Sequence, residues 1–201
     1  MKLFWKIFLK FMGWTWEGEF PHLSKYIIIV GPHTSNQDFV LSLAYRSVLN
    51  ISKARFLGKE SLFKPPLGKL FIKMGGIPVK RDTSNKMVQQ VVEYFNKSEQ
   101  LIIALSPEGT RKKTERLKTG FYHIAKQANI PIVMAAMDYK EKKLIVSEPF
   151  FTSDNEKEDF RNIIKFFASV KGKVPENGFA HLLDSPLYSW YAGKIIVIHT
   201  F

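Results

Sequence analysis

Short aliphatic runs alternate along this chain with segments of helical periodicity, and this alternation restricts the possible folds more than any other feature. The two clearest runs, residues 26–30 (YIIIV) and 101–105 (LIIAL), are continuous, which is typical of strands buried on both faces of a sheet. Apolar residues at helical spacing occupy 39–49, 84–96 and 120–128. Further strands are predicted at 55–57, 77–79, 131–136 and 144–146, and further helices at 67–74 and 157–170. This order predicts an α/β fold in which helices flank a mixed sheet.

The length and composition indicate a single domain. A chain of 201 residues is short enough for one hydrophobic core, and 45% hydrophobic residues exclude a disordered protein. No repeat, low-complexity stretch or composition break divides the sequence. We therefore expect one domain over residues 21–201, preceded at residues 1–20 by an amphipathic helix on a membrane surface.

The helix predicted near the N-terminus, at residues 2–12, carries lysines four residues apart and is apolar elsewhere on its circumference. Trp14 and Trp16 follow it, and tryptophan prefers the boundary between lipid headgroups and acyl chains. This pattern predicts that the helix lies in a membrane surface. The alternative is a helix that packs on the protein's own core with its lysines in water. The residues predicted to contact the membrane are Lys2, Phe4, Trp5, Lys6, Phe8, Lys10 and Phe11.

Neither a signal peptide nor a spanning helix is predicted. Lys6 and Lys10 interrupt the apolar N-terminal stretch, and no alanine precedes Ala44 to form a small-residue cleavage site. The chain also has no run of about 18 uncharged apolar residues that could cross a bilayer.

The charge balance predicts an anionic partner. The sequence has 30 Lys and Arg and 18 Asp and Glu, which gives a formal charge of +12. This charge is compatible with binding to nucleic acid, to an anionic membrane or to a phosphorylated substrate. Nucleic acid is not expected, because the aromatics concentrate in the first helix and in core positions and no nucleic-acid motif occurs. The absence of cysteine excludes disulfides, thiolate zinc sites and cysteine nucleophiles, and no HExxH pair occurs. We expect neither a metal nor a cofactor.

The loop after the first buried run contains a candidate catalytic pair. His33 precedes Asp38 by five residues across a predicted strand-to-helix turn, so that the Asp38 carboxylate can accept a hydrogen bond from the protonated nitrogen of the ring. The other ring nitrogen then becomes a basic acceptor facing a cleft. For an isolated pair, a helix cap or a simple hydrogen bond is the commoner explanation.

Two further loops, also at predicted strand ends, carry glycine and cations. In the loop 75–81 the glycines allow close backbone approach, and Lys80 or Arg81 could meet a phosphate. In the loop 107–111, followed by more cations up to Lys118, backbone amides, a hydroxyl and positive charges resemble an anion site. Taken alone, each loop could equally be a glycine turn or a solvated charge run.

Together these loops resemble the glycerophosphate acyltransferase superfamily, in particular the small enzymes similar to lysophosphatidic acid acyltransferase (1-acyl-sn-glycerol-3-phosphate acyltransferase). His33 and Asp38 match the H-x4-D motif, and residues 76–81 match the glycine-to-arginine motif. Residues 107–111 reproduce P-E-G-T-R, and 130–133 resemble the closing hydrophobic-proline motif. The resemblance covers residues 26–137. It departs from the family at Pro78-Val79, where an aromatic and aliphatic pair is common, and in overall length.

The resemblance implies that residues 21–201 form an acyltransferase domain on the cytoplasmic face of a membrane, as a peripheral or monotopic protein. Acyl-CoA or acyl carrier protein would donate the acyl group to a lyso-phospholipid-like acceptor. His33 would be the base and Asp38 its orienting partner. The acceptor's head would be bound by Arg81, Glu108, Gly109, Thr110, Arg111 and Lys118, with Glu108 either ordering the loop or binding an acceptor hydroxyl.

Two other functions fit the same residues. An esterase or thioesterase could use the same pair with water in place of the alcohol. A membrane-docked or nucleic-acid-binding protein without catalysis would also explain the charge.

Overall fold

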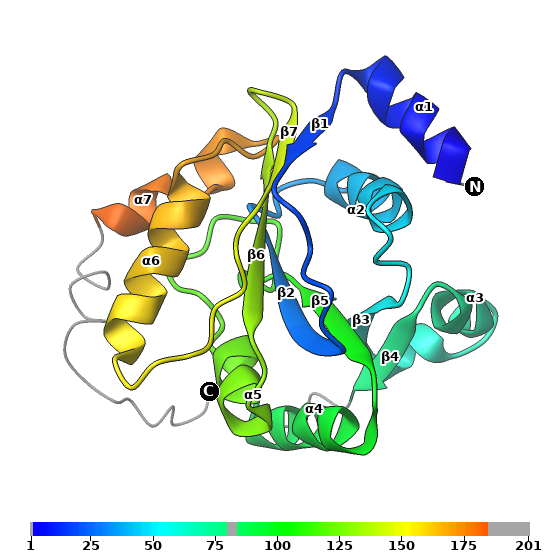
Figure 1. The fold of residues 1–201 in the computed structure, drawn as a ribbon, viewed down its shortest axis with the longest axis vertical. Helices are drawn as coiled ribbons and strands as arrows, with labels where there is room; N and C mark the ends of the chain where they lie inside the picture. The colour runs from blue at the N-terminus through cyan, green and yellow to red at the C-terminus, as the bar shows by residue number, and fades with distance from the viewer. Residues whose placement is uncertain (1, 80–83, 185–201) are drawn as a thin grey trace.

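The computed structural model describes residues 2–79 and 84–184, and within them it shows a mixed seven-stranded sheet with helices on both faces (Figure 1). The predicted fold class is therefore confirmed. The strands are β1 (Thr15–Glu17), β2 (Lys25–Gly31), β3 (Ala54–Lys59), β4 (Gly76–Val79), β5 (Leu101–Leu105), β6 (Ile132–Asp138) and β7 (Lys143–Val146). The helices are α1 (Lys2–Met12), α2 (Gln37–Val48), α3 (Gly68–Lys73), α4 (Ser84–Lys97), α5 (Gly120–Ala128), α6 (Glu156–Ala168) and α7 (Ala180–Leu183). Two 3-10 turns complete the set, η1 (Glu60–Phe63) and η2 (Pro175–Asn177).

The sheet brings several strand ends to one edge. Its order is β1-β7-β6-β2-β5-β3-β4, and β6, β2, β5, β3 and β4 run parallel to one another. The antiparallel pair β6–β7 reverses the direction, and β1 runs parallel to β7. Because β2 and β5 are neighbours and parallel, the loops that follow them lie side by side at the carboxyl edge of the sheet.

Two hydrophobic layers cover the sheet, which explains why the central strand has a continuous apolar run. Tyr26 and Ile28 of β2 face the layer formed with α1 and α2, whereas Ile27 and Ile29 face the layer formed with α4, α5, α6 and α7. Successive strand residues point to opposite faces, so a strand covered on both faces needs apolar residues at every position.

The N-terminal helix packs against the protein with one face and leaves the other exposed. Leu9 is buried, and Trp5 and Phe8 are half-buried against the same cluster. The outer residues Phe4 and Phe11 are 63% and 88% exposed. The inner face of the helix thus packs on the core, as in the second of the two arrangements considered, and its apolar outer face is left in contact with solvent.

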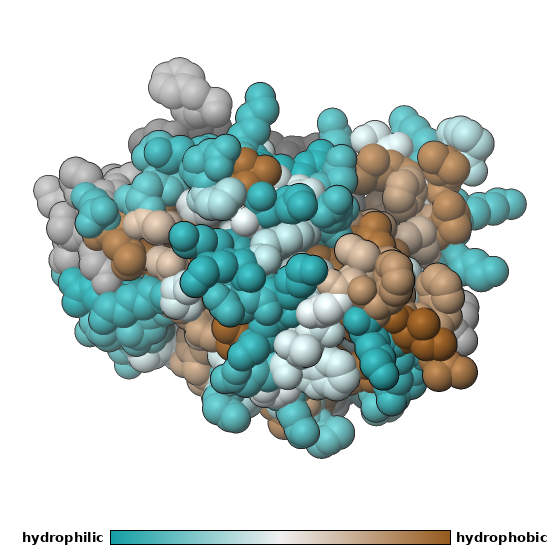
Figure 2. Space-filling view, turned by 90° about the horizontal axis from the view of Figure 1, so that it is seen from above, coloured by the Kyte–Doolittle hydropathy of each residue, from teal (hydrophilic) through white to brown (hydrophobic). Residues whose placement is uncertain are grey.

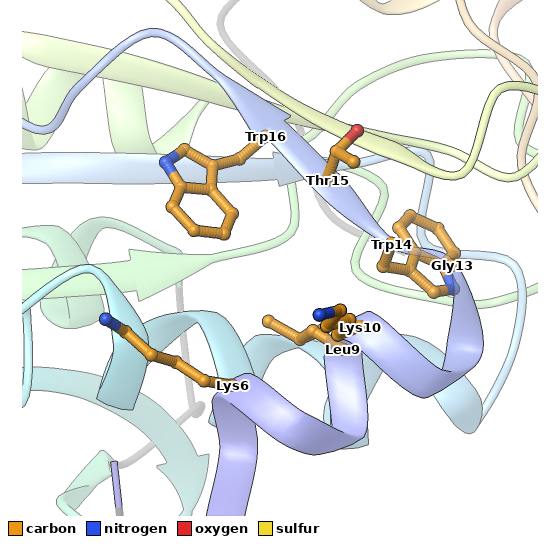
Figure 3. Close-up of a pocket in the computed structure, with 7 residues that line it drawn as sticks. All are labelled: Lys6, Leu9, Lys10, Gly13, Trp14, Thr15 and Trp16. Carbon is orange, nitrogen blue, oxygen red and sulfur yellow. The ribbon is translucent and has the colours of Figure 1, made fainter. Parts of the chain in front are cut away.

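Trp14 differs from its expected place at a membrane boundary. It is 5% exposed and packs edge-on against Tyr139, with ring centroids 4.9 Å apart. The cause is a turn at Gly13, after which the Trp14 amide donates to the Leu9 carbonyl and β1 joins the sheet. Trp16 remains 43% exposed. A hollow of about 320 Å³ separates α1 from β1 and is lined by Lys6, Leu9, Lys10, Gly13, Trp14, Thr15 and Trp16 (Figure 3).

The short elements β1, η1, η2 and α7 were not anticipated, since three or four residues carry too little periodicity to identify them. Residues 195–198 (IIVI) form a β-branched run whose sequence pattern is typical of a strand, but they lie outside the described residues, as does Arg81.

Candidate active site

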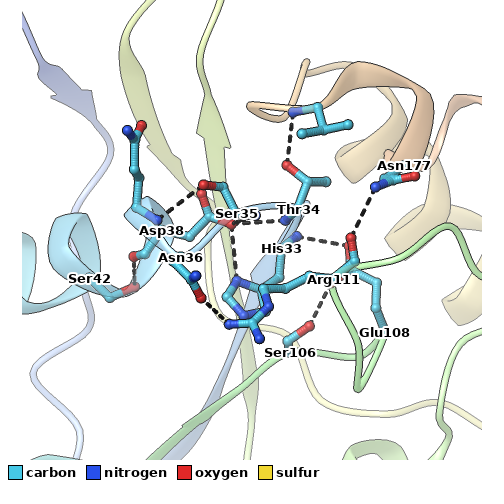
Figure 4. Close-up of polar contacts among 12 residues, drawn as sticks. His33, Thr34, Ser35, Asn36, Asp38, Ser42, Ser106, Glu108, Arg111 and Asn177 are labelled. Carbon is cyan, nitrogen blue, oxygen red and sulfur yellow. Dashed lines mark hydrogen bonds and ion pairs between the residues drawn. The ribbon is translucent and has the colours of Figure 1, made fainter.

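His33 and Asp38 are in direct contact at the carboxyl edge of the sheet. His33 follows β2 and Asp38 lies in the first turn of α2, with 3.0 Å between His33 Nδ1 and Asp38 Oδ2 (Figure 4). Close packing fixes the end of β2, because a Cβ on Gly31 would lie 3.1 Å from the Phe167 ring. A carboxylate can only accept hydrogen bonds, so Nδ1 donates and the neutral ring is left with Nε2 as an acceptor.

Asp38 is buried and hydrogen-bonded through both oxygens. Oδ2 also accepts the amides of Thr34 and Ser35 at 2.8 Å, and Oδ1 accepts the Tyr139 hydroxyl at 2.6 Å. Burial alone would raise the pKa of Asp38, but the hydrogen bonds from His33, Tyr139 and Ser35 outweigh it and hold that pKa below its ordinary value. The carboxylate therefore stays charged and orients the imidazole.

Glu108 joins the two neighbouring loops from behind the site. Its Oε1 accepts the His33 amide at 2.9 Å and its Oε2 accepts the Ser106 hydroxyl at 2.5 Å. Only 2% of the residue is exposed, and burial raises the pKa of its carboxyl to about 7 although both hydrogen bonds oppose the rise. Of the two roles considered for Glu108, this geometry favours ordering the loop.

The last three residues of the P-E-G-T-R loop border a hollow of about 390 Å³, whose lining is His33, Gly109, Thr110, Arg111 and Lys112. Arg111 donates to the Asn36 side chain, and the Asn177 side chain donates to the Arg111 carbonyl at 3.1 Å (Figure 4). Gly109 has φ +66°, and a Cβ there would lie 3.3 Å from the Lys118 side chain. Lys118 thus lies behind Gly109, and Gly109, Thr110 and Arg111 border the hollow together with His33.

Sequence reasoning missed the residues that support this pair from distant segments. Tyr139 follows β6, and Thr34 Oγ1 accepts the Val174 amide at 3.1 Å. Gly172 lies so close that a Cβ there would be 2.8 Å from Thr34 Oγ1. The position of Tyr139 carried a usable signal, since it comes just after a predicted buried strand that ends at the same edge.

The described residues, 2–79 and 84–184, contain neither a cluster of metal ligands nor a membrane-spanning helix. Among them, no group of three or more His, Cys, Asp or Glu side chains could hold a metal ion. Within the same ranges, every helix is too short or too polar to cross a bilayer.

A half-exposed histidine oriented by a buried carboxylate, beside a cationic loop, can take a proton from a hydroxyl group next to an anion. The site has the form expected of an enzyme that activates an alcohol or water. The chain belongs to the acyltransferase family, because the family's sequence model, described as Acyltransferase, matches residues 17–138, more than half of the chain.

Curated relatives and a solved structure agree with this assignment. The chain is 32% identical over 119 residues to 1-acyl-sn-glycerol-3-phosphate acyltransferase of Limnanthes douglasii, a match covering 56% of this chain and 41% of the relative. It is 34% identical over 80 residues to the enzyme of that name from Cocos nucifera, covering 37% and 26%. The chain thus matches less than half the length of these relatives. The fold resembles the crystal structure of the 1-acyl-sn-glycerophosphate (LPA) acyltransferase PlsC from Thermotoga maritima, with TM-score 0.56, 18% identity and coverage of 92% and 78%.

Replacing Glu108 by glutamine should make the protein more stable at alkaline pH relative to the wild type. A carboxyl whose folded pKa is raised from 4.5 to about 7 stabilises the fold at low pH, and this stabilisation is lost as the pH rises through 7. The glutamine side chain has an amide oxygen that accepts and an amide nitrogen that donates hydrogen bonds, and it carries no charge. From pH 5 to pH 8, the variant's free energy of unfolding should gain about 2 to 3 kcal/mol on that of the wild type. Urea unfolding at both pH values measures it, and a constant difference contradicts the raised pKa.

Removing the Tyr139 hydroxyl should raise the pKa of Asp38, because Tyr139→Phe deletes one of its donors. The pKa is read from the Asp38 carboxyl carbon in an NMR titration. Tyr45→Phe is the matched control, since Tyr45 also packs edge-on against Trp14 but donates to the Thr15 carbonyl. Tyr139→Phe should also lower the free energy of unfolding by about 2 kcal/mol. An Asp38 pKa that moves equally in both variants would show that packing, not the hydrogen bond, sets it.

Proposed function

We propose that the protein transfers a fatty acyl group from acyl-CoA or acyl carrier protein to a hydroxyl of a lyso-phospholipid-like acceptor such as 1-acylglycerol-3-phosphate. The observation that carries the proposal is the His33–Asp38 contact, which lies inside the family-matched residues and opens on the hollow formed with the P-E-G-T-R loop. The names of the curated relatives support this acceptor class.

The proposed reaction uses His33 as base and then as acid. Nε2 takes the proton of the acceptor hydroxyl as its oxygen attacks the thioester carbonyl. The resulting tetrahedral intermediate collapses, the carbon–sulfur bond breaks, and the thiol leaves with the proton that His33 returns. Asp38 stays charged and stabilises the imidazolium formed between the two steps. The nucleophile is the acceptor itself, so no residue of the protein is acylated.

The polar head of the acceptor is proposed to bind beside His33. Gly109, Thr110 and Arg111 line the same hollow as the imidazole, and Lys118 lies behind Gly109. Arg81 keeps its predicted role as a phosphate ligand, although it lies outside the described residues. A bound head would align the acceptor hydroxyl with Nε2, which converts binding energy into a lower barrier. Glu108 contributes by holding the His33 backbone.

Substituting the pair should abolish most of the transfer without unfolding the protein. His33→Ala and Asp38→Asn are expected to lower the rate of acyl transfer by about 10²- to 10⁴-fold, the usual contribution of a positioned base. The assay uses the purified chain with acyl-CoA or acyl carrier protein and a panel of lyso-acceptors. His22→Ala is the control, since His22 is an exposed residue before β2.

Product analysis separates transfer from hydrolysis. Free fatty acid that forms at the same rate with and without acceptor would favour the thioesterase alternative. Near-normal transfer by His33→Ala, with an unchanged circular dichroism spectrum, would falsify the proposed mechanism.

The protein is proposed to act at an anionic membrane surface, which it binds through the exposed outer face of α1. Leu3, Phe4, Ile7 and Phe11 are each at least 60% exposed, and they share the helix with the exposed Lys2, Lys6 and Lys10. A helix with an apolar face and a basic stripe binds where acyl chains meet anionic headgroups. Trp5 and Phe8 contribute less, because they already pack on the core.

Polar substitutions on that face should weaken vesicle binding. Phe4→Ser combined with Phe11→Ser is expected to lower partitioning onto anionic vesicles at least about tenfold, since each ring contributes about 1.5 to 3 kcal/mol when buried. Co-sedimentation measures it. Phe151→Ser is the matched control, because Phe151 is 60% exposed but lies between β7 and α6. Equal binding by both variants would mean that the exposed face of α1 does not contact lipid.

A further inference from the structure

A second apolar surface lies on η1, α3 and the turn between them. It consists of Leu62, Leu67, Leu70 and Ile72, which we call the η1–α3 surface. These four side chains are 49% to 56% exposed, although they fall within eleven consecutive residues. Solvent exposure of that many large aliphatic side chains in one short segment indicates an interaction site.

The fold does not need these four side chains to hold the segment in place. Phe63 and Phe71 point inward and pack edge-on, with centroids 6.4 Å apart. The Phe63 ring occupies the space above Gly58 and Gly76, where an added Cβ would lie 2.7 Å and 2.6 Å from it. Two phenylalanines and two glycines thus anchor the segment to β3 and β4, and the outward apolar residues are left for another purpose.

Cations surround the η1–α3 surface. Lys59, Lys64, Lys69 and Lys73 are exposed, and Glu60 is the one acidic residue among positions 59–73. Lysines can lay their aliphatic stems along an apolar surface while their ammonium groups reach outward. This combination is complementary to a bilayer with anionic headgroups, as on α1.

The elements that carry the two apolar surfaces, α1 and α3, lie on the same side of the molecule (Figure 1). Figure 1 places α1, α2 and α3 together on the right, away from the α4–α7 layer. Figure 2, which looks onto the edge where β2, β5 and β6 end, shows hydrophobic side chains gathered on that same side and polar ones across the middle.

We propose that the η1–α3 surface is a second membrane contact, which binds an anionic lipid surface together with α1. The proposal rests on the membrane association proposed for α1 and not on acyl transfer. A single amphipathic helix can roll about its own axis in an interface, whereas two separate contacts fix the orientation of the whole domain. Two apolar, lysine-bordered surfaces on one side fit a planar lipid surface better than one compact protein partner.

Fluorescent labelling tests the proposal directly, because the chain contains no cysteine and a single introduced thiol is labelled uniquely. An environment-sensitive maleimide dye is attached to Leu70→Cys, to Phe4→Cys on α1, or to Phe151→Cys as the control in the full chain. Vesicles with anionic lipid should blue-shift the dye at positions 70 and 4 but not at 151. A response at position 4 alone would overturn the second contact and leave α1 intact. No response at either position would overturn both.

Substitutions then measure the strength of the contact. Leu70→Ser with Ile72→Ser, and separately Lys69→Gln with Lys73→Gln, should each weaken vesicle partitioning about tenfold. Thermal melting checks that the variants fold, and the labelled Leu70→Cys protein decides the matter if they do not. Unchanged partitioning in both double variants contradicts the proposal. Self-association, or binding to an acidic carrier protein, would also contradict the proposal if it requires the η1–α3 surface and if lipid leaves the emission of the dye at position 70 unchanged.

Discussion

The site is organised around one buried carboxylate, Asp38, whose two oxygens bind groups from separate parts of the chain. Oδ2 accepts hydrogen bonds from the His33 ring and from two backbone amides of its own loop. Oδ1 accepts a hydrogen bond from the hydroxyl of Tyr139, which is 101 positions away in sequence. A buried charge is tolerated only with such a set of donors. Asp38 therefore both fixes the histidine and ties the end of β6 to the loop after β2.

Two buried carboxyls border the same histidine, and their surroundings drive their pKa values in opposite directions. The pKa of Asp38 is lowered because four donors reach it, whereas that of Glu108 rises to about 7 because two donors do not offset burial. The charge of Asp38 itself adds to the rise at Glu108. One carboxyl is thus kept ionised against the His33 ring, and the other holds the His33 backbone at little electrostatic cost when protonated.

The sequence predicts features that depend on local pattern, and it misses those that depend on distant packing. The helix at residues 120–128 and the strand at 101–105 have their predicted bounds, and the His33–Asp38 contact follows from a five-residue spacing across one turn. Local pattern does not predict the contacts of Trp14 and Tyr139, because each is made with a segment far along the chain: Trp14 packs on Tyr139, and Tyr139 donates to Asp38. In the sequence, the position of Trp14 next to α1 is typical of a membrane anchor. In the structure, β1 joins the sheet and the Trp14 side chain is buried.

Helix α2 connects the polar site to the apolar side of the molecule. Its first turn carries the buried Asp38, and the next two residues, Phe39 and Val40, are about 40% exposed. The Phe39 ring packs edge-on against Phe56 of β3, the strand that leads into η1. The same short helix therefore presents a charge to His33 and apolar side chains to the side that carries α1 and α3. An acceptor with a polar head and an acyl chain has that same division, so under the proposed function its head can reach the hollow beside His33 while its chain stays on the membrane side.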